Sequence, residues 1–353
     1  MKLGLRFLSI GVIPAILLAM GCGNSASPIP AATTTTSSGS GTTTSGGVFT
    51  QGYFPTLGIA ASTIYVIEQD ASAGTYSVLE FSTSVPSHST PVATVNPVAT
   101  VNAPANTSFS GLAVDGQGYL YVSAVNLTPP ATPEILVYAP GATDASTPVR
   151  TLTSPTLGDA IAVDTTGQIY TYGGLGISVY AAGVTGNAAP LRTIAGDQTQ
   201  LAFAGSIAID NAGNVYVAGT DATSILVFSS GANGNVAPAY VIQGAATGIV
   251  DLYGLAVDSD GDIFVKAGGS GSDILEFAAG ANGNVSPSKK FELGSPTTNL
   301  AVDGAGDLFT TTSLPTQPEA VFSSQSILAA SLSPETFTST AWTNSPTGQI
   351  AVH

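Results

Sequence analysis

The sequence predicts an all-β protein, a β-propeller of six blades of four antiparallel strands each, with seven blades as the alternative. Three observations favour this fold. An aspartate-containing motif recurs at a nearly constant spacing, each period holds four short segments of strand composition, and no segment has the apolar spacing of a long helix. Four strands in every 45 to 50 residues are the proportions of a propeller blade.

The recurring motif ends the first strand of each unit. Its copies are "GLAVDGQGYLYV" from Gly111, "AIAVDTTGQIYTY" from Ala160, "SIAIDNAGNVYVAG" from Ser206, "GLAVDSDGDIFVKAG" from Gly254 and "NLAVDGAGDLFTTT" from Asn299. The shared aspartates are Asp115, Asp164, Asp210, Asp258 and Asp303, spaced by 49, 46, 48 and 45 residues. An earlier unit, "LGIAASTIYVIEQ" from Leu57, lacks the aspartate but keeps the strand pattern, which brings the number of units to six.

The other elements follow in a fixed order within each unit. The small residues of the first strand suit the crowded centre of a propeller, so this strand is expected to be innermost. The third strand ends in an aromatic residue that is expected to pack between neighbouring blades; these residues are Phe81, Tyr138, Tyr180, Phe228 and Phe277. A polar turn precedes the fourth strand, in "GVTGNAAPLRTI" from Gly183, "GANGNVAPAYVI" from Gly231 and "GANGNVSPSKKF" from Gly280.

The end of the chain repeats the first-strand pattern. Ile350, Ala351 and Val352 stand in "GQIAVH", about one period after Asp303. They form either the closing strand of a six-bladed ring or a seventh inner strand completed by "VFTQGYF" near the start of the domain. Either arrangement joins strands from both chain ends in one blade and leaves no exposed edge.

The N-terminus predicts export and a lipid anchor. Residues 1–22 read as a signal peptide, with Lys2 and Arg6 before an apolar run that is short for a membrane span. The run ends in "LAMGC", which resembles a bacterial lipobox and makes Cys22, the only cysteine, the lipidation site. Residues 23–48 are rich in Ser, Thr and Gly and are expected to form a flexible linker, and residues 49–353 form the propeller. Gly23 after the cysteine implies, through the same resemblance, an outer-membrane lipoprotein that faces the periplasm or the exterior.

Charge excludes nucleic acid as a partner. The chain has 22 acidic and 7 basic residues, and its formal charge of −15 becomes −17 without Lys2 and Arg6. Such a domain repels phosphate backbones and anionic lipid surfaces. Contact with a membrane is therefore expected through the lipid anchor only.

The recurring aspartates are interpreted as turn residues. In Asp-x-x-Gly between two strands, aspartate accepts backbone N–H groups ahead of it and glycine suits the fourth position of the turn. Asp260 and Asp262 add two acids to one copy, but the glycine position and the missing closing glutamate do not match a calcium loop of the EF-hand type. The alternative is a ring of the five aspartates that holds a cation at the mouth of the channel. We assign no metal ligand.

The sequence presents no catalytic constellation and no cofactor motif. Its two histidines are His88, in a polar loop, and His353, at the end, and neither belongs to a cluster with metal-ligand spacing. "GGLG" at 173 to 176 is expected to be a turn between strands, since no helix follows it as in a phosphate-binding loop.

Taken together, the motif copies resemble the NHL-repeat class of β-propellers over residues 52 to 323. The chain lacks the arginines with which some members bind RNA. Some similar propellers are lactonases or lyases, which leaves a hydrolase or lyase with acidic residues and a metal at the channel mouth as the alternative function. The first hypothesis is a binding or scaffolding module for an envelope protein or glycan, with ligand contacts on the loops 126–133, 197–205 and 245–253. A purely structural envelope component is the third possibility.

Overall fold

The computed structural model describes residues 63–70, 73–82, 93–94, 99–174, 176–201, 205–219, 223–250, 252, 254–267, 273–292, 297–303, 308–312, 321–324, 335–338 and 346–352. All of them belong to the second of the two units into which the chain divides, Phe54–His353. The signal peptide, Cys22, the linker, His88 and His353 therefore lie outside the described residues.

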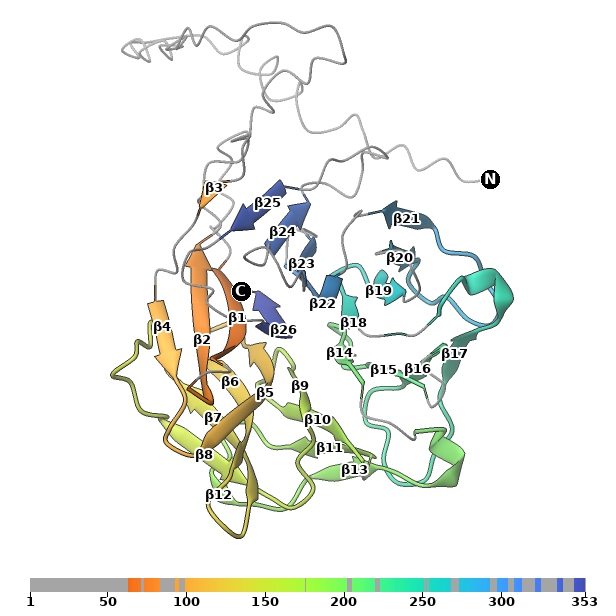
Figure 1. Cartoon of the computed structure of the whole chain (residues 1–353). Helices are drawn as coiled ribbons and strands as arrows, with labels where there is room; N and C mark the ends of the chain where they lie inside the picture. The colour runs from red at the N-terminus through yellow and green to blue at the C-terminus, as the bar shows by residue number, and fades with distance from the viewer. Residues whose placement is uncertain are drawn as a thin grey trace, which may run out of the picture. The chain divides into compact units, whose positions relative to one another are not determined.

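The described strands form six sheets of four antiparallel strands, two of which gain a short parallel strand (Figure 1). Sheet 1 consists of β26 (Pro346–Val352), β1 (Thr63–Asp70), β2 (Thr75–Ser82) and β4 (Ala99–Asn102). Sheet 2 consists of β5 (Thr107–Val114), β6 (Leu120–Asn126), β7 (Thr132–Tyr138) and β8 (Arg150–Thr153), with β12 (Gly186–Asn187) parallel to β8. Sheet 3 consists of β9 (Ala160–Val163), β10 (Ile169–Gly173), β11 (Gly176–Tyr180) and β13 (Arg192–Ile194).

The remaining sheets repeat this plan. Sheet 4 consists of β14 (Ile207–Ile209), β15 (Val215–Ala218), β16 (Ser224–Phe228) and β17 (Tyr240–Gln243). Sheet 5 consists of β18 (Gly254–Val257), β19 (Ile263–Ala267), β20 (Asp273–Phe277) and β21 (Lys289–Glu292). Sheet 6 consists of β22 (Thr297–Val302), β23 (Leu308–Thr312), β24 (Val321–Ser324) and β25 (Glu335–Thr338), with β3 (Ala93–Thr94) parallel to β25. This arrangement confirms the all-β propeller fold.

The first strands of the sheets contact one another in cyclic order. The order is β26, β5, β9, β14, β18, β22 and again β26. Strand β26 pairs with β1, with Val352 opposite Ile64 and Ala351 opposite Tyr65. The prediction that one sheet combines strands from both chain ends is confirmed. "VFTQGYF" and residues 57–62 lie outside the described residues, while the rest of the segment from Leu57 belongs to β1.

The third-strand aromatics pack between adjacent sheets, as predicted. All five are at most 6% exposed. Tyr180 of sheet 3 shares a core cluster with Tyr121 and Val137 of sheet 2, and Phe277 of sheet 5 shares one with Tyr216 of sheet 4. Burial of each ring contributes about 2 kcal/mol, so these side chains hold neighbouring sheets together.

The loops that precede the fourth strands also connect adjacent sheets. We call residues 183–188, 231–236 and 280–285 the inter-sheet loops. The first contributes β12, which pairs with β8, and the other two form single parallel bridges, Gly234 with Ile194 and Gly283 with Ile242. Strand β3 makes the equivalent contact from sheet 1 to β25 of sheet 6. The segment before the fourth strand therefore connects adjacent sheets both along the chain and between sheets 1 and 6.

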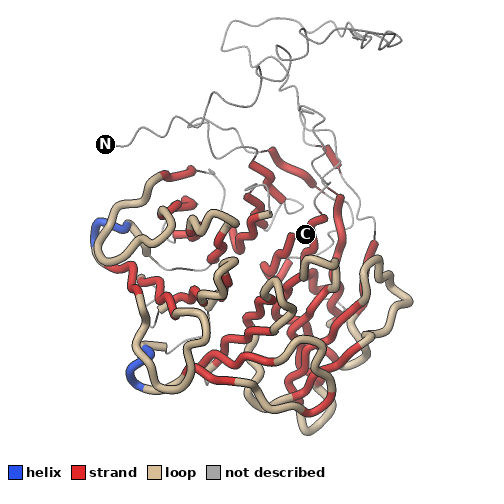
Figure 2. The backbone as a smooth tube through the Cα atoms, turned by 180° about the vertical axis from the view of Figure 1, so that it is seen from behind, coloured by secondary structure: helices blue, strands red, loops and turns tan. Residues whose placement is uncertain are grey.

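Helix is confined to two short segments among the described residues (Figure 2). They are the 3₁₀ helices η1 (Asp197–Thr199) and η2 (Ala245–Thr247), each after the fourth strand of a sheet. No helix in this part of the chain is long and apolar enough to cross a membrane.

Candidate functional site

The Asp-x-x-Gly turns lie between the first and second strands of the sheets. In sheet 2, Asp115 Oδ1 accepts the N–H groups of Gln117 (3.0 Å) and Tyr119 (2.9 Å), and the N–H of Gly118 donates to the Asp115 carbonyl (2.9 Å). Gly118 has a φ of +81°, which suits a type I turn closed by a left-handed residue. Asp164, Asp210 and Asp258 repeat this geometry, which confirms the turn interpretation for four of the five aspartates. The turn after Asp303 lies outside the described residues.

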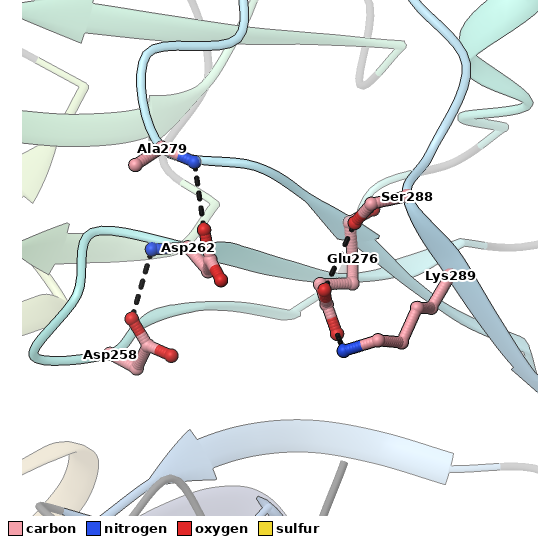
Figure 3. A network of polar contacts seen from close by, with 6 residues as sticks. All are labelled: Asp258, Asp262, Glu276, Ala279, Ser288 and Lys289. Atoms are coloured by element: carbon pink, nitrogen blue, oxygen red, sulfur yellow. Dashed lines mark hydrogen bonds and ion pairs between the residues drawn. The ribbon is translucent and has the colours of Figure 1, made fainter. Parts of the chain in front are cut away.

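The acid-rich copy, "GLAVDSDGDIFV", is a turn of the same kind (Figure 3). Asp258 Oδ1 accepts the N–H groups of Asp260 (3.0 Å) and Asp262 (2.9 Å), and Asp262 Oδ1 accepts the N–H of Ala279 (2.8 Å). Burial raises the pKa of Asp258, partly offset by these backbone hydrogen bonds. Within the described ranges, no three His, Cys, Asp or Glu side chains are arranged to hold a metal ion.

The second carboxylate oxygen of three turn aspartates accepts a tyrosine hydroxyl. Asp115 Oδ2 accepts from Tyr121 (3.0 Å), and Asp164 and Asp210 accept from Tyr170 (3.1 Å) and Tyr216 (3.0 Å). Burial is the main cause that raises the pKa of all three hydroxyls, and the neighbouring aspartates raise it further. These hydroxyls therefore keep their protons and donate to the carboxylates. Phe264 takes this place in sheet 5.

An arginine completes the arrangement in sheets 2 and 3. Arg150 Nη2 donates to the Tyr121 hydroxyl (3.2 Å), and the guanidinium carbon lies 5.5 Å from the ring centre of Tyr119 and 5.7 Å from that of Tyr121. Arg192 repeats this contact with Tyr170, at 3.1 Å to the hydroxyl and 5.6 Å to the ring centre. Each site therefore runs from carboxylate to hydroxyl to guanidinium.

Lys289 occupies the position in sheet 5 that corresponds to Arg150 in sheet 2, and an ion pair neutralises its charge. Lys289 stands opposite Glu276, whereas Arg150 stands opposite Val137. Lys289 Nζ lies 3.0 Å from Glu276 Oε2, and the Ser288 hydroxyl donates to Glu276 Oε1 at 3.0 Å (Figure 3). Lys290, which follows Lys289, forms an ion pair with Asp273, with 2.9 Å between Nζ and Oδ2.

A pocket of about 630 Å³ lies between the Asp115 turn of sheet 2 and the Asp164 turn of sheet 3. We call it the inter-sheet pocket. It is lined by Asp115, Gly116, Gln117, Tyr119, Tyr121, Val149, Arg150, Asp164, Thr165, Thr166, Gly167, Ala182 and Gly183. Tyr119 and Arg150 are half-buried, while Gln117, Thr165 and Thr166 are exposed. The pocket thus joins one cation, two carboxylates, one partly buried aromatic ring and several hydroxyl and amide groups.

The inter-sheet pocket differs from the surfaces expected from the sequence. None of the described residues of loops 126–133, 197–205 and 245–253 lines the pocket. These loops follow second or fourth strands, whereas the pocket is built by two turns that follow first strands, by Val149 and Arg150 at the start of β8 and by Ala182 and Gly183 after β11. Tyr121 and Arg150 were not identified as site residues. The signal available for them was the recurrence of tyrosine six residues after Asp115, Asp164 and Asp210 and of arginine in "TPVRTL" and "APLRTI".

No model of a known protein family matches the chain, and neither does any curated protein. Among solved structures, the chain is similar to a proposed 6-phosphogluconolactonase from Bacteroides uniformis, at 16% identity and a TM-score of 0.49, over 78% of this chain and 81% of that one. It is similar to the periplasmic gluconolactonase of Pseudomonas aeruginosa, at 12% identity and a TM-score of 0.48, over 75% and 80%. A third is YCF48 bound to a D1 peptide, at 11% identity and a TM-score of 0.43, over 77% and 76%. Likenesses of this size carry no conclusion about function, and the fold rests on the strand pairing described above.

Proposed function

We propose that this protein is a binding module of the bacterial envelope, a six-bladed propeller that takes an envelope glycan or protein in the inter-sheet pocket. The pocket is the observation that carries this proposal. Its volume of about 630 Å³ falls in the range of about 300 to 1,000 Å³ that is usual for ligand sites.

Hydrogen bonds within the protein order the two turns that form the walls of the pocket. Asp115 and Asp164 each accept backbone N–H groups within their own turns and a tyrosine hydroxyl from the adjacent strand. A site that is already ordered loses little conformational entropy on binding, which favours affinity. The polar groups fix the orientation of a ligand, and Tyr119 offers apolar surface.

Two kinds of contact support six blades as the closed form. The first strands touch in cyclic order through β26, and β3 joins sheet 1 to sheet 6 in the way that β12 joins sheet 3 to sheet 2. We propose the NHL-type repeat for these blades on the five motif copies from Gly111 to Asn299.

The envelope location and the anchor are proposed from the sequence of residues 1–48. Cleavage before Cys22 would make this lipidated cysteine the first residue of the exported chain, and residues 23–48 would hold the propeller at a distance from the bilayer.

The test uses a side chain that fills the pocket. Ala182 lines it, and Ala279 is the equivalent residue in sheet 5, since each Cβ lies 3.3 Å from where a Cβ on the turn glycine would be. We expect Ala182→Trp to weaken saturable binding on a glycan array, or to immobilised envelope proteins, by at least about tenfold. Ala279→Trp should leave that binding unchanged.

Equal loss in both variants, or in neither, would contradict the assignment of the pocket. Conversion of a bound glycan or lactone to product over time would instead support the hydrolase or lyase hypothesis. Thermal melts of both variants serve as a control, because they show whether each variant is folded at the temperature of the binding assay.

A further inference from the structure

We propose that the inter-sheet pocket binds an acidic glycan and that Arg150 binds the carboxylate of a uronic-acid residue. This inference rests on the proposed function, because it names the ligand class of the same pocket.

Among the described residues, Arg150 is a cation without an acidic partner, and it belongs to a strongly acidic protein. The chain has 22 acidic and 7 basic residues, and Lys289 and Lys290 form ion pairs. Among the described residues, Arg150 makes one hydrogen bond, to the neutral hydroxyl of Tyr121, and no ion pair. Four of the five N–H donors of its guanidinium therefore make no hydrogen bond to the described residues, and the side chain lines the pocket.

The local sequence explains this arrangement. Val137 occupies the cross-strand position that Glu276 fills opposite Lys289, so no carboxylate reaches Arg150 from the third strand. Asp115 already accepts two backbone N–H groups and the Tyr121 hydroxyl, which lies between its carboxylate and the guanidinium. The cation is thus held near acids but is not neutralised by one.

The guanidinium is also held in one orientation. It lies 5.5 Å from the ring centre of Tyr119 and 5.7 Å from that of Tyr121, and its hydrogen bond to Tyr121 fixes one edge. A planar guanidinium binds a carboxylate through two parallel hydrogen bonds, and pre-orientation reduces the entropic cost of this contact. A carboxylate on the ligand is the chemical complement of this group.

The rest of the lining favours a sugar over an acidic peptide. Gln117, Thr165 and Thr166 offer amide and hydroxyl groups, which match a ligand rich in hydroxyls. A glutamate side chain of an acidic peptide brings a carboxylate on an apolar stem and has no hydroxyl to donate to Asp115 or Asp164. A uronic-acid unit brings one carboxylate, and its hydroxyls can donate to these aspartates.

The experiment is calorimetric titration of the protein with trigalacturonate, with its neutral methyl ester and with triglutamate. We expect trigalacturonate to bind and Arg150→Gln to weaken this binding by about tenfold to hundredfold. The methyl ester should bind the parent protein more weakly than trigalacturonate does, by a similar factor. Lys289→Gln is the matched control, since Lys289 occupies the equivalent register position in sheet 5 and lies outside the pocket lining, and it should change the affinity by less than about twofold.

Each other outcome overturns the inference in a distinguishable way. If the methyl ester binds as tightly as trigalacturonate, or if Arg150→Gln keeps full affinity, the proposed contact between Arg150 and a carboxylate is wrong. Loss of binding in Ala182→Trp would still support the pocket as the binding site. If only triglutamate binds, the ligand class is an acidic peptide and not a sugar. If no probe binds the parent protein, acidic glycans are excluded as ligands. If Arg150→Gln melts at a lower temperature, Arg150→Lys keeps the charge without the planar group and should bind with intermediate affinity.

Discussion

At the scale of single residues, Asp115, Asp164 and Asp210 use their two carboxylate oxygens for different purposes. One oxygen accepts the N–H groups that close the turn, and in three sheets the other accepts a buried tyrosine hydroxyl. The same residue therefore shapes the hairpin and orients the tyrosine that, in two of these sheets, positions an arginine.

The acid-rich turn allows a direct comparison of two aspartates. Asp258 accepts two backbone N–H groups, whereas the Asp260 side chain is exposed and makes no hydrogen bond within the described ranges. We expect Asp258→Ala to lower the free energy of unfolding in urea by about 2 kcal/mol. Asp260→Ala should change it by less than about 0.5 kcal/mol. Equal losses, or a calcium-dependent thermal midpoint in the parent protein, would indicate a cation site instead.

The sequence predicted the turns but not the residues that surround them. Asp-x-x-Gly is a local pattern whose hydrogen bonds stay within four residues, so it can be recognised without knowledge of the fold. The contact between Tyr121 and Arg150 spans 29 residues and depends on the register of three strands. The strand pairing places Val137, and not an acidic residue, opposite Arg150. This register cannot be read from the sequence.

At the scale of elements, the inter-sheet loops join sheets 3, 4 and 5 each to the sheet before it. Asn284 Oδ1 accepts the N–H of Ala246 (2.7 Å), and Asn235 Oδ1 accepts that of Gln198 (2.8 Å). Each asparagine reaches across to the segment that begins the 3₁₀ helix of the neighbouring sheet. The recurring turn before the fourth strand, "GANGNV" in two of its copies, was recognised in the sequence, but its contact with the preceding sheet required the structure.

Gly244 tests this contact. Its φ is +124°, and a Cβ placed on it would lie 2.5 Å from Asn284 Oδ1. We expect Gly244→Ala to lower the free energy of unfolding by about 2 to 4 kcal/mol, because the backbone strain and the clash add. Gly231→Ala is the control, since Gly231 has a φ of +79° and open space around it, and it should cost about 1 kcal/mol. Equal costs in urea unfolding would mean that the asparagine contact contributes nothing.

At the scale of the whole molecule, the pocket exists because neighbouring sheets are held side by side in cyclic order. The sequence predicted the propeller from its period, since a repeat of this length with four strands leaves few other folds. It left the closure open, because "GQIAVH" has the pattern of a first strand whatever its partner. Pairing of β26 with β1 is a contact between residues almost 300 positions apart, which no local pattern reveals.

Hydrogen–deuterium exchange of the intact protein, with and without trigalacturonate, tests most directly the claim that two adjacent turns of a closed propeller form the binding site. Without ligand, the amides of β26 should exchange as slowly as those of β5 and β9. With ligand, further slowing should appear at residues 115–121 and 164–170 and be absent from loop 126–133. Fast exchange in β26, or slowing at 126–133 in place of the two turns, would contradict it.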